Sequence, residues 1–380
     1  MTQTERRTKV GVNLLWLVPG VVGGSENYIT RLLHALAREA PHDVDVELFA
    51  LRQFPEVHPE LAGRFRTVIA PIDGSNKPLR VMAESTWLAR QLARERIDVV
   101  HHAGGRVPLV SRVPSVVTIH DLQPLDMPDN FTTVKRNFLR RAIPRSVARA
   151  AVVTAPSEYV RSRIVELLGV ARERTAVVSA PLREQAQIAT TRETAAVATL
   201  LDAGDPYFVY PAITYPHKNH LTLLYAFARM RHERPDVRLV LTGAEGPEEA
   251  AVSAGIASLG LEGSVLRTGR VPRGDLDALI GRATALVFPS RYEGFGLPVL
   301  EAMAAGCPVI AADATALPEV VDGVGTLVGP DDIAGWAAAM TAALGHTRSV
   351  DADAERARAA MFSSGRSVEA LVDAYHRAAR

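Results

Sequence analysis

The chain has a single cysteine and no long apolar run, and each shortage excludes a class of protein. Cys307 has no second cysteine to pair with among the 380 residues, so an internal disulfide is excluded and a reducing compartment is expected. No stretch of about 18 apolar residues occurs, which argues against a membrane-spanning helix. The apolar run at 10–18 is too short to span a membrane and lacks a signal-peptide cleavage region, so we expect a cytoplasmic protein.

An excess of charge of one sign is also missing. The net charge is +1, whereas a nucleic-acid-binding protein is expected to be strongly basic, so no nucleic-acid partner is predicted. The balance hides an asymmetry: residues 1–180 hold 25 Lys and Arg against 18 Asp and Glu, and residues 181–380 hold 18 against 24. This difference indicates two lobes of opposite charge. The length suits two or three domains of roughly 100–200 residues each.

Short apolar, β-branched runs alternate with helical patterns along both halves of the chain. They predict strands at 10–17, 44–49, 98–101, 115–119, 151–155 and 175–179, and again at 207–210, 237–241, 265–268, 285–288 and 308–311. Nearly continuous apolar strands separated by helices are typical of parallel sheets covered on both faces. The fold class is therefore α/β, with two Rossmann-like doubly wound domains. Ligands bind beyond the carboxyl ends of such strands, which predicts a site in a cleft between the domains.

The strand pattern also predicts the domain limits. We expect an N-terminal domain at 1–182, a connection at 183–205, a second domain at 206–362 and a C-terminal helix at 363–380 that can pack back on the N-terminal lobe. Near the start of the chain, Ser25 is predicted to cap a helix. Its apolar face consists of Ile29, Leu32, Leu33 and Leu36, at the spacing of one helical side.

The residues with the clearest chemistry follow the strand predicted at 285–288. Glu293 lies in a loop, Gly294 and Gly296 allow close backbone approach, Pro298 suits the first position of a helix, and Glu301 is expected in its first turn. Free amides at a helix start suit a diphosphate, and carboxylates accept hydrogen bonds from sugar hydroxyls. The alternative is an ordinary capped helix with a solvated Glu301, but the concentration of these features after a strand favours a binding site.

This segment resembles the Glu-x7-Glu signature of the retaining glycosyltransferases of family 4. The match runs through Tyr292-Glu-Gly-Phe-Gly-Leu-Pro298, Leu300-Glu-Ala-Met303 and Gly306-Cys-Pro-Val309, and continues into Leu317-Pro-Glu-Val320. Weaker matches at Gly23-Gly-Ser-Glu26, His120-Asp121 and Lys218-Asn219 extend the resemblance over most of the chain. The resemblance implies the GT-B architecture, no metal, no bound cofactor, and retention of anomeric configuration.

The resemblance also implies roles for residues of the second domain. Glu293 would bind hydroxyls of the donor sugar and Glu301 those of the ribose, while Lys218 would neutralise the diphosphate. The backbone of Gly294, Phe295, Gly296 and Leu297 would face sugar and phosphate, and that of Val271 would line the base pocket. Many relatives place an Arg six positions before the lysine, where this chain has Ala212, so phosphate neutralisation would depend more on Lys218 and helix dipoles. A solvated surface lysine is the alternative for Lys218.

In the first domain, the resemblance assigns His120 to catalysis. His120 ends a predicted strand and would contact a donor hydroxyl or the acceptor; a histidine bonded only to backbone is the alternative. Gly23 and Gly24 would present a helix start to the donor phosphates, and Glu26 and Asp121 would lie on the acceptor side. His101 and His102 are not predicted to bind a metal, because adjacent strand residues face opposite ways.

Residues 131–149 hold six Lys and Arg and no acid, with apolar residues between them. This pattern fits either a peripheral contact with the inner face of a membrane or an ordinary solvated helix face.

The resemblance favours a hexosyltransferase that uses GDP-mannose, with UDP- and dTDP-sugars as alternatives, on a glycan, lipid-linked or small-molecule acceptor, as in polysaccharide biosynthesis. Two other classes stay open. One is a non-hydrolysing sugar-nucleotide epimerase, and the other is a non-catalytic nucleotide-sugar-binding protein of the same fold. A dehydrogenase is disfavoured, because Gly20-Val-Val-Gly-Gly24 is not Gly-x-Gly-x-x-Gly.

Overall fold

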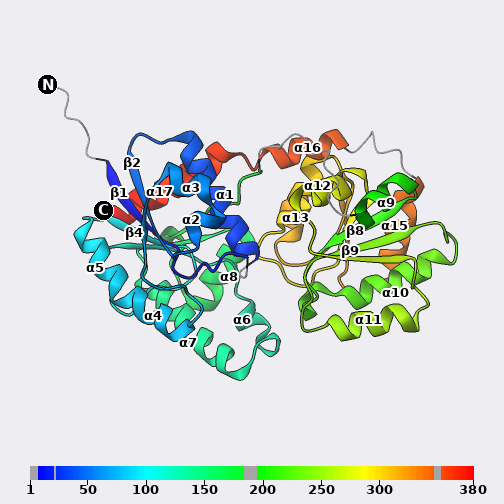
Figure 1. Cartoon of the computed structure of the whole chain (residues 1–380), viewed down its shortest axis with the longest axis horizontal. Coiled ribbons are helices and arrows are strands. Elements are labelled where there is room, and N and C mark those ends of the chain that lie inside the picture. Colours follow the sequence, from blue (N-terminus) through cyan, green and yellow to red (C-terminus); the bar gives the residue numbers. More distant parts are fainter. Residues whose placement is uncertain (1–6, 21–22, 184–194, 346–351) are drawn as a thin grey trace. The chain divides into compact units, whose positions relative to one another are not determined.

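A computed structural model describes residues 7–20, 23–183, 195–345 and 352–380. The chain divides into two compact units: residues 1–181 with 362–380 form unit 1, and residues 182–361 form unit 2. The chain therefore passes from one unit to the other twice. Each unit is built on a parallel sheet flanked by helices (Figure 1), which confirms the predicted pair of Rossmann-like domains.

Within the described residues, the sheet of unit 1 has seven strands in the order β3-β2-β1-β4-β5-β6-β7. They are β1 (Thr8–Asn13), β2 (Val44–Ala50), β3 (Arg66–Ile69), β4 (Val99–His102), β5 (Ser115–Thr118), β6 (Val152–Ala155) and β7 (Thr175–Val177). The order reverses between β1 and β4, since Val10 pairs with Val46 on one side and Val99 on the other. A doubly wound sheet binds ligands beyond the carboxyl ends of its strands at such a switch point.

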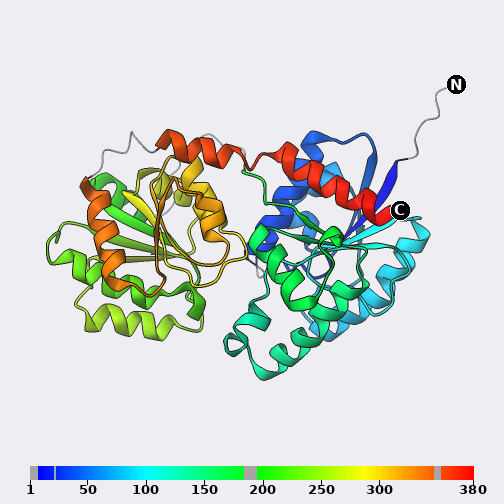
Figure 2. The ribbon, with the colours of Figure 1, turned by 180° about the vertical axis from the view of Figure 1, so that it is seen from behind.

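Helices cover both faces of this sheet. They are α1 (Gly24–Glu39), α2 (Phe54–Val57), α3 (Pro59–Arg64), α4 (Lys77–Ser85), α5 (Trp87–Arg94), α6 (Gln123–Asp126), α7 (Thr133–Arg149), α8 (Glu158–Leu168) and α17 (Ser364–Ala379). Apolar residues of α4, α5, α7 and α8 pack on one face. The last helix, α17, lies along α1 and crosses β1 and β4–β7 on the other face (red in Figure 2).

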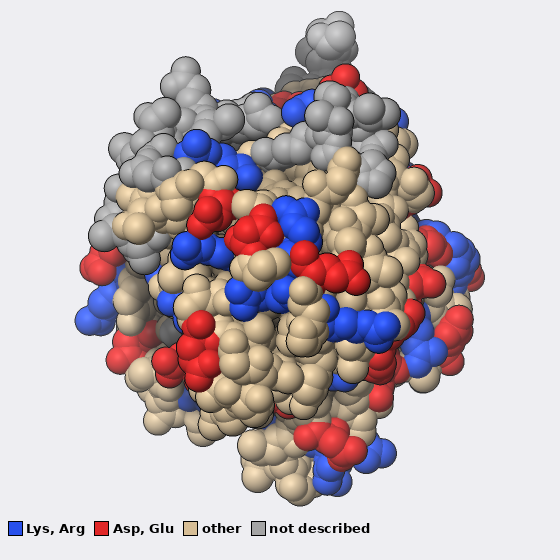
Figure 3. Space-filling model, turned by 90° about the vertical axis from the view of Figure 1, so that its right-hand side faces the viewer, with Lys and Arg blue, Asp and Glu red and all other residues tan. Residues whose placement is uncertain are grey.

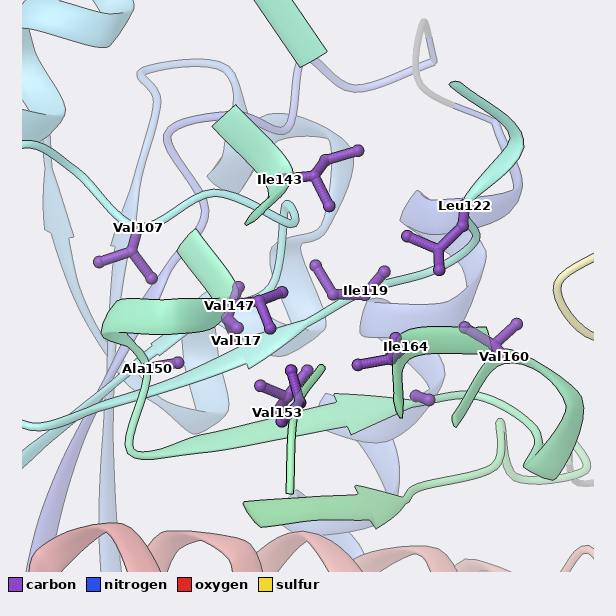
Figure 4. Packing of buried hydrophobic residues seen from close by; sticks show 12 residues of the cluster. Val107, Val117, Ile119, Leu122, Ile143, Val147, Ala150, Val153, Val160 and Ile164 are labelled. Carbon is purple, nitrogen blue, oxygen red and sulfur yellow. The ribbon is translucent and has the colours of Figure 1, made fainter. Parts of the chain in front are cut away.

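Figure 4 shows how α7 and α8 are held on unit 1. Ile143 and Val147 from α7 and Ile164 from α8 meet Val117 of β5 and Val153 of β6, and all five are buried. Burying an aliphatic side chain of this size contributes about 1.5–3 kcal/mol. This core therefore fixes the loops that leave the carboxyl ends of β4 and β5.

The sheet of unit 2 has six strands within the described residues, in the order β10-β9-β8-β11-β12-β13. They are β8 (Tyr207–Pro211), β9 (Arg238–Thr242), β10 (Val265–Gly269), β11 (Ala285–Phe288), β12 (Val309–Ala312) and β13 (Thr326–Val328). The helices are α9 (Ala195–Ala203), α10 (His220–Arg231), α11 (Glu249–Ser258), α12 (Arg273–Arg282), α13 (Leu297–Ala304), α14 (Leu317–Val321), α15 (Ile333–Gly345) and α16 (Ala352–Ala360). The order reverses between β8 and β11, which makes a second switch point. Helix α9 occupies part of the segment expected to be a connection.

Three local predictions were wrong. The first strand ends at Asn13 and not at Leu17, because the Asn13 side chain accepts a hydrogen bond from the Leu15 amide at 3.1 Å and starts a turn. Helix α1 begins at Gly24 with Gly23 as its N-cap, so Ser25 lies inside the helix. Glu301 lies in the second turn of α13 and Pro298 at its second position, because the left-handed Gly296 starts the helix at Leu297.

Two strands, β3 and β13, were not predicted from the sequence. Strands β3 and β13 are sheet edges with partly exposed residues, so they lack the continuous apolar character that identified the inner strands. The predicted apolar face of α1 is confirmed: Ile29, Leu32, Leu33 and Leu36 are all buried.

Candidate active site

Two loops of unit 2 meet at its switch point, one after β8 and one after β11. The first ends in a 3-10 turn, Pro216–Lys218, and continues through Asn219 in the left-handed conformation (φ 60°) into α10. The His217 carbonyl accepts hydrogen bonds from the Arg291 amide at 2.8 Å and the Ser290 hydroxyl at 3.3 Å. These bonds tie the loop that carries Lys218 to the loop that carries Glu293.

Asn219 fixes the position of Lys218. Its buried side-chain amide donates to the carbonyls of Pro289 at 3.2 Å and Pro330 at 2.6 Å, and its oxygen accepts from the Thr222 hydroxyl at 2.7 Å. The Tyr210 hydroxyl donates to the Lys218 carbonyl at 2.6 Å. Burial, with a smaller contribution from the nearby Glu293, raises the pKa of Tyr210 well above its ordinary value, so this hydroxyl stays a neutral donor.

Lys218 and Glu293 form an ion pair between Nζ and Oε1 at the carboxyl ends of two neighbouring strands. The side chains are 18% and 14% exposed, so both groups keep a route to a ligand. The Glu293 amide donates to the Thr315 hydroxyl at 3.0 Å, which fixes the loop from the other side. The pair places an ammonium group, which suits a phosphate, directly beside a carboxylate, which suits sugar hydroxyls.

The helix that follows begins at a glycine the backbone requires. Gly296 has φ 113°, and a Cβ there would lie 2.8 Å from Cδ2 of Leu317. Phe295 is buried beside it and Leu297 is the first helical residue, so the amides of the first turn of α13 follow directly on the Glu293 loop. Amides in a first helical turn lack partners within the helix and attract anions.

Glu301 has a partner that the sequence did not identify. Nη1 of Arg273 lies 3.0 Å from each of the two Glu301 carboxylate oxygens. Nη2 of Arg273 lies 2.8 Å from Asp277, which is also paired with Arg183. Burial lowers the pKa of Arg273, and Asp277 acts against that shift. The predicted Val271 lies in the same loop, two residues earlier. The signal available was a cation at the first position of a helix, where the dipole favours an acid.

A second network spans the carboxyl ends of β8 and β10. Arg267 binds Glu249 through two guanidinium nitrogens, at 2.7 Å and 2.5 Å. Glu249 also accepts from the Thr214 hydroxyl at 3.0 Å, and Thr214 accepts from the Gly246 amide at 2.7 Å. Arg267 is thus paired with Glu249, whereas Lys218 is paired with Glu293.

In unit 1, His120 follows β5 and contacts two aromatic side chains. Its ring centroid lies 5.1 Å from that of Tyr28 and 6.1 Å from that of Trp16. Nε2 bonds the Ala103 carbonyl at 2.7 Å, so Nε2 carries the proton and Nδ1 is the acceptor nitrogen of the neutral ring. Burial lowers the pKa of His120 to about 4, so the ring is uncharged at neutral pH. The hydrogen bond to backbone that the sequence analysis gave as the alternative for His120 is present. Nδ1 is the nitrogen that can accept a hydrogen bond from a hydroxyl.

The two carboxylates predicted on the acceptor side, Glu26 and Asp121, form hydrogen bonds within the chain. Glu26 accepts from the Gly20 amide at 2.9 Å and binds Nε2 of His58 at 3.0 Å, so it ties the glycine turn to the segment after α2. Gly23, with φ 76°, begins α1 as its N-cap, and Gly24 is the first helical residue. Asp121 accepts from the Gln123 amide at 3.0 Å, which shapes the start of α6.

His101 and His102 point to opposite sides of the sheet. His101 bonds the Tyr375 hydroxyl at 3.0 Å and the Thr118 hydroxyl at 2.7 Å, and His102 bonds Asn13 at 3.2 Å. Burial lowers the pKa of each histidine to about 3. Among the described residues, no group of three His, Cys, Asp or Glu is arranged to hold a metal ion. In the same part of the chain, no helix combines the length and apolar character needed to cross a membrane.

Comparison with known families separates the chain into two matched regions. The family described as "Glycosyltransferase Family 4" matches residues 22–182, and "Glycosyl transferases group 1" matches residues 191–359. The two regions contain the site residues named above for units 1 and 2, apart from Asn13, Trp16, Gly20, Arg183 and Tyr375.

Individual proteins are similar to this chain over most of its length. O-antigen chain mannosyltransferase B of Escherichia coli is 30% identical over 63% of this chain and 64% of its own length, so the chain matches somewhat less than two thirds of that relative. D-inositol 3-phosphate glycosyltransferase of Nocardia farcinica is 29% identical over 94% of this chain and 85% of its own. The solved structure of Anabaena HepE in complex with UDP and glucose has a TM-score of 0.74 at 21% identity, over 97% of this chain and 99% of HepE, which shows a shared fold.

Proposed function

Because the chain belongs to glycosyltransferase family 4, we propose that it transfers a hexose, with mannose as the first candidate, from a nucleotide-diphosphate sugar to a hydroxyl acceptor. The observation that carries the proposal is the ion pair of Lys218 and Glu293 at the switch point of unit 2. The sugar and the β-phosphate of such a donor are adjacent groups. A carboxylate and an ammonium in direct contact suit them together.

The donor is assigned to unit 2 and the acceptor to unit 1. Glu293 binds the sugar hydroxyls, Glu301 the ribose, the first-turn amides of α13 the phosphates, and Val271 the base side. In unit 1, His120 accepts a hydrogen bond from a hydroxyl through Nδ1, and its partly exposed neighbour Trp16 offers apolar surface to a sugar ring. Mannose is preferred because the mannosyltransferase of Escherichia coli is among the relatives.

The transfer is proposed to retain anomeric configuration and to need no metal. The acceptor oxygen bonds to the anomeric carbon on the face from which the diphosphate leaves, the glycosidic C–O bond breaks, and the acceptor proton passes to the departing phosphate. Lys218 stabilises the charge that develops on that phosphate. An inverted anomer in the purified product would contradict this mechanism.

The first test is nucleotide binding in the presence of EDTA. Wild-type protein, Glu301→Gln and the control Glu262→Gln, an exposed acid of unit 2, are melted with millimolar GDP, UDP or dTDP. A ligand that binds only the folded state raises the melting temperature. We expect one nucleotide to stabilise wild type and Glu262→Gln but not Glu301→Gln. Stabilisation by none of them would contradict the donor site.

Product analysis then separates enzyme classes. The stabilising nucleotide's sugar donor, GDP-mannose first, is incubated with the protein alone and with glycan or lipid-linked acceptors. A glycosylated acceptor supports transfer. Isomerised donor without acceptor would indicate an epimerase, and binding without turnover would indicate a non-catalytic protein.

A peripheral membrane contact through 131–149 is also proposed. Helix α7 exposes Val134 and Phe138 among its cations, and Leu79 and Met82 of α4 are exposed as well. By contrast, basic and acidic side chains are interspersed on the face shown in Figure 3. Exposed apolar residues among cations suit an anionic lipid surface, and this contact would bring a lipid-linked acceptor to the inner face of a membrane.

A further inference from the structure

Arg273 occupies an unfavourable position for an arginine. It is the first residue of α12, its N-cap Pro272 provides no side-chain hydrogen bond, and the helix dipole disfavours a cation there. Its Nε is buried and has no hydrogen-bond partner within the described part of the chain. An acid or a capping residue at the start of α12 would stabilise the helix better than an arginine does. The side chain is therefore explained by what its guanidinium contacts.

Those contacts converge on the carboxylate assigned to the ribose. Nη1 lies 3.0 Å from both Oε1 and Oε2 of Glu301, whose side chain is 9% exposed. A carboxylate has about four lone-pair sites, so one bridging N–H leaves acceptor capacity on each oxygen. Two equivalent oxygens held in a fixed plane match the two neighbouring hydroxyls of a ribose.

Asp277 holds the other side of the guanidinium. It lies one helical turn after Arg273 with its Oδ1 2.8 Å from Nη2, and Arg183 binds its second oxygen. The arrangement is a row of alternating charges, Glu301, Arg273, Asp277 and Arg183. Each inner group has an opposite charge on both sides, which restricts the orientation of Arg273 and so of Glu301.

We propose that Arg273 is a positioning residue that orients the Glu301 carboxylate for the ribose diol and thereby determines whether the site distinguishes ribonucleotides from 2′-deoxyribonucleotides. This inference rests on the proposed function, because it assumes that Glu301 binds the ribose. Arg273 itself acts through Glu301. Asp277 contacts Arg273 and acts on Glu301 only through it, so loss of Asp277 should have a smaller effect in the same direction.

The test is a ratio of dissociation constants measured by calorimetry. GDP is compared with 2′-deoxy-GDP, and UDP with 2′-deoxy-UDP, on the full chain. A hydrogen bond to a charged group corresponds to about a ten- to hundredfold difference, which is the ratio expected for wild type. Arg273→Met should lower it to within about threefold of unity, and Asp277→Asn and Arg273→Lys should give intermediate ratios. Arg282→Met, which removes the same charge from the other end of α12, should keep the wild-type ratio.

A second readout separates orientation from general damage. Loss of ribose contacts weakens ground-state and transition-state binding alike, so Arg273→Met should raise the KM for the donor with kcat nearly unchanged. Melting curves check that each variant folds, and Arg273→Lys serves if Arg273→Met does not.

The outcomes distinguish the inference from the function beneath it. A wild-type ratio that Glu301→Gln abolishes but Arg273→Met and Arg273→Lys preserve would overturn the inference and leave the donor site intact. Wild-type protein that binds none of the four nucleotides and is not stabilised by dTDP would overturn the proposed function, and the inference with it. Stabilisation by dTDP alone would overturn the inference and leave the proposed function standing. A wild-type ratio near unity would also overturn the inference, because there would be no discrimination for Arg273 to set.

Discussion

At the switch point of unit 2, hydrogen bonds of the backbone and of Asn219 position the two charged residues. Lys218 is placed by bonds to its own carbonyl and by Asn219, and Glu293 by its amide. These bonds bring the Lys218 ammonium and the Glu293 carboxylate together. A change at Lys218 therefore tests charge, with the loop geometry left in place.

Lys218→Ala should lower kcat/KM for the sugar nucleotide by roughly 10²–10³-fold, because the departing phosphate loses its cation. Lys218→Arg should recover part of the loss, since the charge returns in a different shape. The control is Arg229→Ala, an exposed cation of α10. Wild-type kcat/KM in a folded Lys218→Ala variant would remove this residue from the mechanism.

Gly296 tests the backbone at the start of α13. Gly296→Ala should destabilise unit 2 by about 1–3 kcal/mol, because φ is 113° and the new Cβ would meet Leu317 at 2.8 Å. Gly281→Ala in α12 is the matched control: its Cβ meets nothing within 4 Å, and replacing a helical glycine stabilises by about 0.5–1 kcal/mol. Denaturant unfolding measures both. Equal effects of the two changes would contradict the backbone argument.

Among the elements, α17 connects the end of the chain to the sheet of unit 1. Its residues are separated from β4 by most of the sequence, yet the Tyr375 hydroxyl bonds the buried His101. Tyr375→Phe should cost about 1–3 kcal/mol, because a buried imidazole nitrogen loses its partner. Calorimetry should show this loss in the transition of unit 1, with Tyr225→Phe on exposed surface as the control. An unchanged melting temperature would argue that the bond contributes nothing.

Helix α7 carries the prediction about membranes. The protein should co-sediment with vesicles containing phosphatidylglycerol and not with pure phosphatidylcholine. Each cation near an anionic surface contributes about 1 kcal/mol, so Arg140→Gln with Arg141→Gln should weaken binding by more than tenfold. Arg229→Gln with Arg282→Gln removes equal charge from unit 2 and should have little effect. Equal weakening by both pairs would point to net charge and not to α7.

The molecule as a whole should be acid-sensitive because five of its histidines are buried or partly buried and have lowered pKa values. Burial lowers the pKa of His101 and His102 to about 3, and of His120, His217 and His220 to about 4. As pH falls below about 6.5, these histidines become protonated in the unfolded chain, whereas in the folded chain they stay neutral until near pH 4. The stabilisation is thus complete above pH 6.5 and is lost on acidification.

Each such histidine adds up to about 1.4 kcal/mol per pH unit to the slope. Unit 1 holds three of the five, so its calorimetric transition should fall faster than that of unit 2 between neutral pH and about pH 5. His120→Gln should reduce the slope of unit 1, and the exposed His232→Gln should leave both unchanged. Melting temperatures that stay constant over this range would contradict the prediction.

The sequence by itself determined whatever repeats over short distances. Apolar strands alternating with amphipathic helices predicted two doubly wound sheets, and the dense run from Glu293 to Glu301 predicted one side of a donor site. These features are local, because each depends on residues within one or two turns or on one face of a strand. Edge strands β3 and β13 escaped notice, since their exposed residues remove the signal.

Tertiary structure alone decided which side chains meet. Arg273 reaches Glu301 across 28 positions, Lys218 reaches Glu293 across 75, and Tyr375 reaches His101 across 274. No periodicity encodes such pairs. The first two arise because parallel strands bring the segments that follow them to one edge of a sheet, and the third because α17 packs on the face of the sheet of unit 1. The identity of the partner then follows from burial: a carboxylate or imidazole that loses water must find a charge or a hydrogen bond, whichever part of the chain supplies it.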